Sequence, residues 1–156
     1  MDAYNDALKA MDEMFGRDYQ FALATCSEDK PSLRFVDAYY KDGQFWVVTY
    51  RNSRKVKDIL QNPNVELCYK LFTFSGKAYD VGHPLKDENA KIRSELIKVF
   101  EPWYFAHNDE NDENMCYVRI EPERGFFYKD RKGYKMDFLQ QTASTFPFED
   151  EINITN

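Results

Sequence analysis

The chain has 156 residues, of which 43% are hydrophobic and 17% aromatic, and its formal net charge at pH 7 is −6. This length favours a single domain with a proper core, and the aromatic content is typical of a β-rich fold. The acidic balance argues against a nucleic-acid binder, which usually carries a basic field, and no apolar run approaches the roughly 18 residues of a membrane span.

The first third of the chain predicts one helix followed by strands. Apolar side chains recur at helical spacing over residues 2–15, and Gly16 is placed to end that helix. Short apolar runs at residues 19–26, 33–41 and 44–50 predict strands. The last two runs are joined by Asp42-Gly43, which is a strong hairpin signal.

A short helix is predicted over residues 53–61, with Ser53 or Asn52 as its N-cap. Its apolar stripe consists of Val56, Ile59 and Leu60. Asn62-Pro63 ends the helix, because proline cannot continue it.

The second half predicts further strands at residues 64–72 and 74–82, with Gly76 at a bulge or a close backbone approach. A helix returns over residues 86–100, and residues 115–129 predict one or two late strands. From Asp130 onward the polarity is mixed without a clear period, so residues 131–156 are predicted to be an extension or a tail.

Hairpin-linked strands dominate this order of elements. It favours one domain over residues 1–156, with a core at about 5–130, built as an antiparallel barrel whose ends are plugged by helices. The three cysteines are odd in number and far apart, so we expect free thiols and a cytoplasmic location.

The start of the short helix carries an unexpected charge pattern. Arg51, Arg54, Lys55 and Lys57 surround it, although a helix N-terminus carries partial positive charge and favours acids. An anion bound there would resolve the conflict, because backbone N–H groups, the Ser53 hydroxyl and the bases would all bind it. The alternative is a solvated helix start that Asp58 partly offsets.

Arg34 adds to this pattern from inside a strand-like run. On a strand it shares a face with Val36, Ala38 and Tyr40, and the hairpin brings the strand that ends in Thr49 alongside. A phosphate could then be shared by Arg34, Ser53, Arg54 and Lys55. The alternative for Arg34 is an ordinary salt bridge, with Asp37 or Glu66 as its partner.

Residues Phe21 to Gly82 resemble the flavin-binding split barrels related to pyridoxamine-phosphate oxidase. The resemblance lies in the segments FALAT, PSLRFVDAYYKDGQFWVVTYRNSRKVKDILQNPNVELCY and FSGKA. The general-stress-protein and nitroimidazole-resistance branches look closer than the oxidase proper. The resemblance implies a mainly β fold, a Greek-key antiparallel split β-barrel with peripheral helices, that forms a homodimer with FMN between the subunits.

The resemblance also implies roles for single residues. The positions that match the family's phosphate-binding residues are Arg34, Ser53, Arg54 and Lys55. Val48 and Thr49 match the strand end beside the flavin and its ribityl chain, and Phe35, Val36 and Asp37 lie on the strand that passes the isoalloxazine ring. Trp103 and Tyr104 are candidates for contacts to a partner's cofactor, although core or dimer packing is the favoured interpretation.

The chain departs from the oxidase proper in two places. It ends in FPFEDEINITN, without the Trp- and Arg-bearing substrate motif of the true oxidases, so we do not expect the vitamin B6 reaction. Tyr39 lies near the position where that enzyme's flavin strand carries a lysine.

The favoured function is an FMN-dependent oxidoreductase, in which a hydride passes through flavin N5 to oxygen or a small electron-poor acceptor. No catalytic side chains are identified and no substrate is specified. A non-catalytic flavin or haem binder, such as a store or sensor, is the main alternative, and a single-stranded nucleic-acid binder is a distant third. His83 and His107 lack partners at ligand spacing, so no metal site is predicted.

Overall fold

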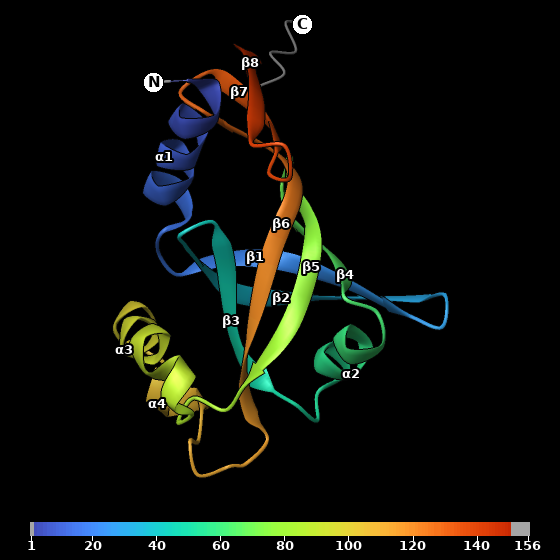
Figure 1. The fold of residues 1–156 in the computed structure, drawn as a ribbon, viewed down its shortest axis with the longest axis vertical. Helices are drawn as coiled ribbons and strands as arrows, with labels where there is room; N and C mark the ends of the chain where they lie inside the picture. The colour runs from blue at the N-terminus through green and yellow to red at the C-terminus, as the bar shows by residue number, and fades with distance from the viewer. Residues whose placement is uncertain (1, 151–156) are drawn as a thin grey trace, which may run out of the picture.

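Eight antiparallel strands form one continuous sheet in the computed structural model, which describes residues 2–150 (Figure 1). The strands are β1 (Tyr19–Ser27), β2 (Lys30–Lys41), β3 (Gln44–Tyr50), β4 (Asn64–Tyr69), β5 (Phe72–Gly82), β6 (Met115–Lys129), β7 (Lys132–Asp137) and β8 (Thr142–Pro147). The helices are α1 (Ala3–Phe15), α2 (Arg54–Gln61), α3 (Ala90–Val99), which follows the 3-10 turn η1 (Asp87–Asn89), and α4 (Tyr104–His107).

Six of these strands close into a barrel. Their order is β3-β2-β1-β4-β5-β6, and β6 pairs back onto β3. The long β6 strand makes this closure possible, because Met115–Ile120 pair with β3 while Arg124–Lys129 pair with β7. The closed antiparallel barrel with peripheral helices confirms the predicted split-barrel fold.

The barrel is split between β2 and β3. The hairpin turns at Asp42 and Gly43, whose φ angles of 49° and 83° fit the tight turn that their sequence predicts. The two strands pair only from Ala38–Lys41 to Gln44–Val47. Beyond that ladder β2 stays with β1, and β3 stays with β6. The chain therefore holds two diverging strand edges at the place where the sequence predicts a cofactor.

Helix α1 inserts its last aromatic ring into the barrel. The ring centroid of Phe15 lies 5.5 Å from those of Phe21 and Phe74 and 5.9 Å from that of Phe127. The predicted bulge or close backbone approach at Gly76 is confirmed. The strand register shifts there, and an added Cβ would lie 2.1 Å from the Glu121 carbonyl oxygen. Aromatic packing around one helix end therefore forms the main core.

Helices α3 and α4 pack on the outer wall of the barrel, so the prediction that helices plug its ends is wrong for these two, whereas Phe15 of α1 does enter the main core. Leu96, Phe100 and Tyr104 form a second buried cluster there with Tyr39 and Tyr117 of the sheet. Tyr104 is fully buried, so its predicted role in packing is confirmed. No helix among residues 2–150 is long and apolar enough to cross a membrane.

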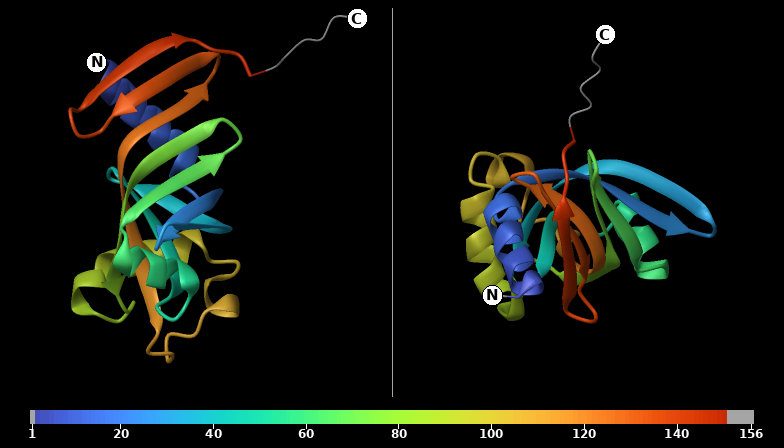
Figure 2. Two further views of the ribbon diagram at one scale, coloured as in Figure 1. Left: turned by 90° about the vertical axis from the view of Figure 1, so that its right-hand side faces the viewer. Right: turned by 90° about the horizontal axis from the view of Figure 1, so that it is seen from above.

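The sequence predicts no regular structure after Asp130. The structure instead has two strands there. Strands β7 and β8 extend the far half of β6 and pack beside α1 (Figure 2). The turn at Asp130 and Arg131 takes positive φ angles without glycine, and β8 is mostly exposed. Neither a turn signal nor apolar alternation therefore marks these strands. Residues 151–156 of the predicted tail lie outside the described residues.

Candidate functional site: a cationic cluster in the strand split

Arg34 lies at the open end of the split, with its guanidinium turned toward β1. One terminal nitrogen donates hydrogen bonds to the Leu23 carbonyl oxygen (3.2 Å) and the Thr25 hydroxyl (2.7 Å). The other donates to the Ser32 hydroxyl at 2.7 Å. Burial lowers the pKa of Arg34 from its usual range, although a neighbouring carboxylate opposes that shift. A partly buried guanidinium is thus fixed in place by neutral oxygens.

The carboxylate beside Arg34 belongs to Asp58 of α2, and not to Asp37 or Glu66, which were the partners considered in the alternative of an ordinary salt bridge. A terminal nitrogen of Arg34 lies 3.9 Å from Oδ2 of Asp58. The Thr25 hydroxyl donates a 2.7 Å hydrogen bond to the same oxygen. Asp58 is only 6% exposed, so this acid is part of the buried contact between α2 and β1.

The two bases at the start of α2 approach the same place. Nε of Arg54 lies 3.8 Å from Oδ2 of Asp58. Lys55 donates a 3.0 Å hydrogen bond to the Thr49 hydroxyl at the end of β3. Burial lowers the pKa of the Lys55 amine, and nearby Arg34 lowers it further. Residues from both diverging strands and from α2 therefore meet at the split.

These four side chains, Arg34, Arg54, Lys55 and Asp58, are called the cationic cluster below. Three bases face one carboxylate, which leaves two positive charges. Ser53 is the N-cap residue of α2, but its hydroxyl donates to the Tyr50 carbonyl at 2.6 Å and does not cap the helix. The first N–H groups of α2 therefore add their partial positive charge. The arrangement suits a doubly charged anion such as a phosphate monoester.

The other predicted cofactor residues lie along the two strand edges. Phe35, Val36 and Asp37 belong to the part of β2 that has left β3, and Val48 and Thr49 belong to the corresponding part of β3. Side chains alternate as predicted, with Val36 inside the barrel and Phe35 outside. Burial, and then the neighbouring carboxyl of Asp18, raise the pKa of Asp37 to about 6.

Sequence reasoning missed the importance of Asp58 and Thr25. It placed Leu60 in the apolar stripe of the helix, but Leu60 is 61% exposed and Asp58 is buried in its place. The available signal was the i,i+4 spacing of Arg54 and Asp58 next to the apolar Ile59. That spacing indicates a pair, but it cannot show that a threonine from β1 completes it.

Two exposed apolar side chains lie on the outer wall of β2. Leu33 and Phe35 of β2 are 70% and 69% exposed. Their partners on β1 are Ala24 and Ala22, and Ala24 in turn pairs with the exposed Glu66 of β4. Large exposed apolar faces commonly mark contact surfaces.

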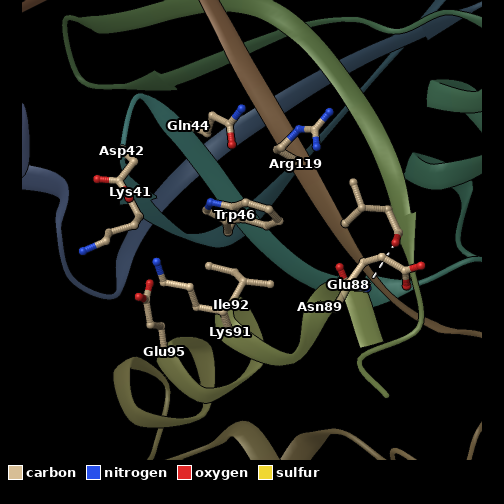
Figure 3. Close-up of a pocket in the computed structure, with 11 residues that line it drawn as sticks. Lys41, Asp42, Gln44, Trp46, Glu88, Asn89, Lys91, Ile92, Glu95 and Arg119 are labelled. Carbon is tan, nitrogen blue, oxygen red and sulfur yellow. Dashed lines mark hydrogen bonds between the residues drawn. The ribbon is translucent and has the colours of Figure 1, made fainter. Parts of the chain in front are cut away.

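A separate pocket of about 350 Å³ lies between α3 and the outer wall and is called the Trp46 pocket below. Figure 3 shows the Trp46 ring facing Ile92 of α3, with Gln44 and Arg119 on the sheet side. Bases and acids are balanced in its lining, which contains Lys41, Lys91, Arg119, Asp42, Glu88 and Glu95. Nε of Arg119 is buried without a hydrogen-bond partner among the described residues.

The histidines do not build a metal site in the described part of the chain. Nε2 of His83 lies 3.1 Å from the Asp112 carbonyl oxygen, and Nδ1 accepts from the Leu85 N–H. Among residues 2–150 no group of three or more His, Cys, Asp or Glu side chains is arranged to hold a metal ion.

Comparisons with known proteins bear on this geometry. The family model described as pyridoxamine 5'-phosphate oxidase matches residues 7–129. General Stress Protein 26 from Bacillus anthracis is a similar solved structure, with 25% identity and a TM-score of 0.55 over 76% of this chain and 92% of that chain. This similarity agrees with the predicted general-stress-protein branch.

Two further solved structures share the fold at lower identity. A pyridoxamine 5'-phosphate oxidase-related, FMN-binding protein from Nostoc punctiforme has 16% identity and a TM-score of 0.59, with 96% of this chain and 98% of that chain covered. HutZ, the haem storage protein from Vibrio cholerae, has 16% identity and a TM-score of 0.61, with 83% and 96% covered. No match was found among curated proteins.

Proposed function

Because the chain belongs to the pyridoxamine 5'-phosphate oxidase family, we propose that it binds FMN and that the cationic cluster holds the phosphate. The single observation that carries the proposal is the two uncompensated positive charges that meet at the N-terminus of α2. A terminal phosphate carries close to two negative charges at neutral pH, so the residues present fit the phosphate of FMN.

The strand split supports a place for the rest of the cofactor. Residues 35–37 of β2 and 48–49 of β3 have no ladder partners across the split, so their backbone edges are available to the ribityl chain and the ring. Val36 and Thr49 are buried on the inner side. These positions would orient the ring and keep water from one of its edges.

We also propose a homodimer in which a second copy covers the cofactor. The exposed side chains of Leu33 and Phe35 precede and follow Arg34 along β2 but point to the outer face of the sheet, so a partner seated on this face would bury apolar surface on the strand that carries Arg34. All three cysteines remain unpaired in the structure, which supports a reducing, cytoplasmic location.

When bound, FMN would supply hydride-transfer chemistry between a reductant and oxygen or a small electron-poor acceptor. The protein's own residues then bind, orient and shield, and no side chain has to act as a general acid or base. We therefore favour an FMN-dependent oxidoreductase.

A non-catalytic flavin or haem binder is the second candidate, and the similarity to a haem storage protein favours it. Neither histidine belongs to the cationic cluster, and His83 already holds the loop that carries Asp112. A haem would therefore need a binding mode that the cluster does not provide.

The absorbance spectrum of the purified protein tests the proposal, followed by release and identification of the chromophore. We expect a flavin spectrum and released FMN, and a nicotinamide cofactor should bleach it if the protein is an oxidoreductase. A bound flavin that no nicotinamide cofactor reduces would favour the non-catalytic candidate. Protein that carries no flavin and binds no added FMN would contradict the proposal.

A further inference from the structure

One oxygen of Asp58 organises the cationic cluster. Oδ2 accepts the hydrogen bond of Thr25 at 2.7 Å, and it lies 3.9 Å from Arg34 and 3.8 Å from Arg54. Thr25 in turn accepts a 2.7 Å hydrogen bond from Arg34. Thr25 and Asp58 are 2% and 6% exposed, so the centre of the cluster is buried although Arg54 reaches into solvent.

The contacts of Asp58 hold the two guanidinium groups without consuming their donors. At 3.8–3.9 Å neither arginine makes a direct hydrogen bond to the carboxylate. Arg54 has no hydrogen bond to another side chain within residues 2–150, and its guanidinium donors remain available to a ligand. Arg34 and Arg54 repel each other, as the lowering of the Arg34 pKa by Arg54 indicates. The carboxylate between them opposes that repulsion.

We propose that Asp58 is a positioning residue that sets Arg34 and Arg54 for a phosphate monoester dianion. This inference rests on the proposed function and concerns the same site. Neutral oxygens of Leu23, Thr25 and Ser32 already hold Arg34. Without the carboxylate, Arg54 would therefore move away from Arg34, and the donors of the two arginines would no longer converge on one group. Preorganised donors lower the cost of binding, so affinity for the phosphate should depend on Asp58 even though Asp58 carries the same sign of charge as the ligand.

The sign of the effect distinguishes positioning from simple charge. If Asp58 only reduced the positive charge of the cluster, its removal would strengthen the binding of a dianion. If Asp58 positions the arginines, its removal weakens that binding and leaves a ligand without phosphate unaffected. Riboflavin is that ligand, because it is FMN without its phosphate.

The experiment measures the dissociation constants of FMN and riboflavin for the flavin-free protein and for Asp58→Asn. We expect the constant for FMN to rise about tenfold and that for riboflavin to stay the same. Glu110→Gln is the control, because Glu110 is also largely buried, with its side chain 13% exposed, and pairs with Arg93 of α3 at 2.8 Å, away from the cluster. It should leave the ratio of the two constants unchanged.

Thr25 provides a second route if Asp58→Asn fails to fold. Thr25→Val removes the hydroxyl that aims the carboxylate and should raise the constant for FMN alone, while Thr25→Ser should retain wild-type affinity. Equal or tighter FMN binding by Asp58→Asn, or by Thr25→Val where the first variant does not fold, overturns the inference. A wild-type protein that binds FMN no better than riboflavin overturns the proposed phosphate site itself, and the inference with it.

Discussion

The cationic cluster and the Trp46 pocket lie at different walls of one barrel, near α2 and α3 respectively (Figure 1). The pocket encloses about 350 Å³ around an aromatic ring, but its three bases face three acids. In the cluster, three bases face a single acid. The comparison teaches that a pocket and an excess of positive charge lie at different places on the barrel, and that the charge carries the argument for a phosphate ligand.

The largest expected effect comes from removing two bases from the cluster. Arg54→Ala combined with Lys55→Ala should weaken FMN binding by about 3 kcal/mol, from two charge-assisted contacts of at least about 1.5 kcal/mol each. The matched control removes two bases from the Trp46 pocket, as Lys41→Ala with Lys91→Ala, and should leave affinity unchanged. Isothermal titration of both variants with FMN makes the comparison. Equal losses of FMN affinity in the two double variants would contradict the assignment of the phosphate to the cationic cluster.

A smaller loss of FMN affinity is expected when the salt concentration is raised. FMN affinity should fall several-fold as ionic strength rises from about 0.1 M to about 1 M, because the screening length shrinks from roughly 10 Å to about 3 Å. Riboflavin affinity should change little over the same range. Fluorescence titrations at the two salt concentrations measure both ligands. A parallel fall for both ligands would contradict a phosphate clamp.

Asp37 provides a contrast to the cationic cluster, because it lies on β2 near the cluster but its neighbouring group is another acid, Asp18. Its pKa is raised to about 6 by burial and Asp18, so the stability that its protonated form contributes is fully present below about pH 4 and is lost as pH rises through 6. Asp37→Asn should therefore be more stable than wild type by about 1 kcal/mol at neutral pH, after allowance for solvent screening. The advantage should vanish below about pH 4. Thermal unfolding across this range measures it, and an unchanged pH slope would refute the assignment.

The smallest effect is expected in the Trp46 pocket. Among residues 2–150, the buried Nε of Arg119 has no hydrogen-bond partner, and the guanidinium forms a half-exposed ion pair with Glu121 and lies 5.6 Å from the centroid of the Tyr79 ring. Arg119→Met should change the free energy of unfolding by less than about 1 kcal/mol, since an exposed ion pair contributes little and an unsatisfied donor is removed. FMN affinity should stay the same. Denaturant unfolding and FMN titration together check this, and a clear loss of FMN affinity would move the ligand toward the pocket.

Much of the site follows from local sequence rules. The Asp42-Gly43 turn fixes the hairpin register, and alternation along β2 then puts Arg34 on the barrel side with Val36. The N-cap at Ser53 fixes the start of α2 and therefore the places of Arg54 and Lys55. Turn and cap signals act over a few residues, so these positions were predictable.

The remaining features depend on contacts between distant segments. Asp58 is buried because Thr25, 33 residues away, donates to it, and no spacing within α2 shows that. Strands β7 and β8 form because they add to an existing β6 edge and pack beside α1, although their own polarity is mixed. The burial of Asp58 and the formation of β7 and β8 depend on tertiary contacts, which helical or strand periodicity alone does not identify.

A crystal structure of the protein with bound FMN tests the central claim most directly. The account predicts that the phosphate lies within hydrogen-bonding distance of Arg34, Arg54 and Lys55, with the ring along the split between β2 and β3. A phosphate seated in the Trp46 pocket, or anywhere away from the N-terminus of α2, would contradict it.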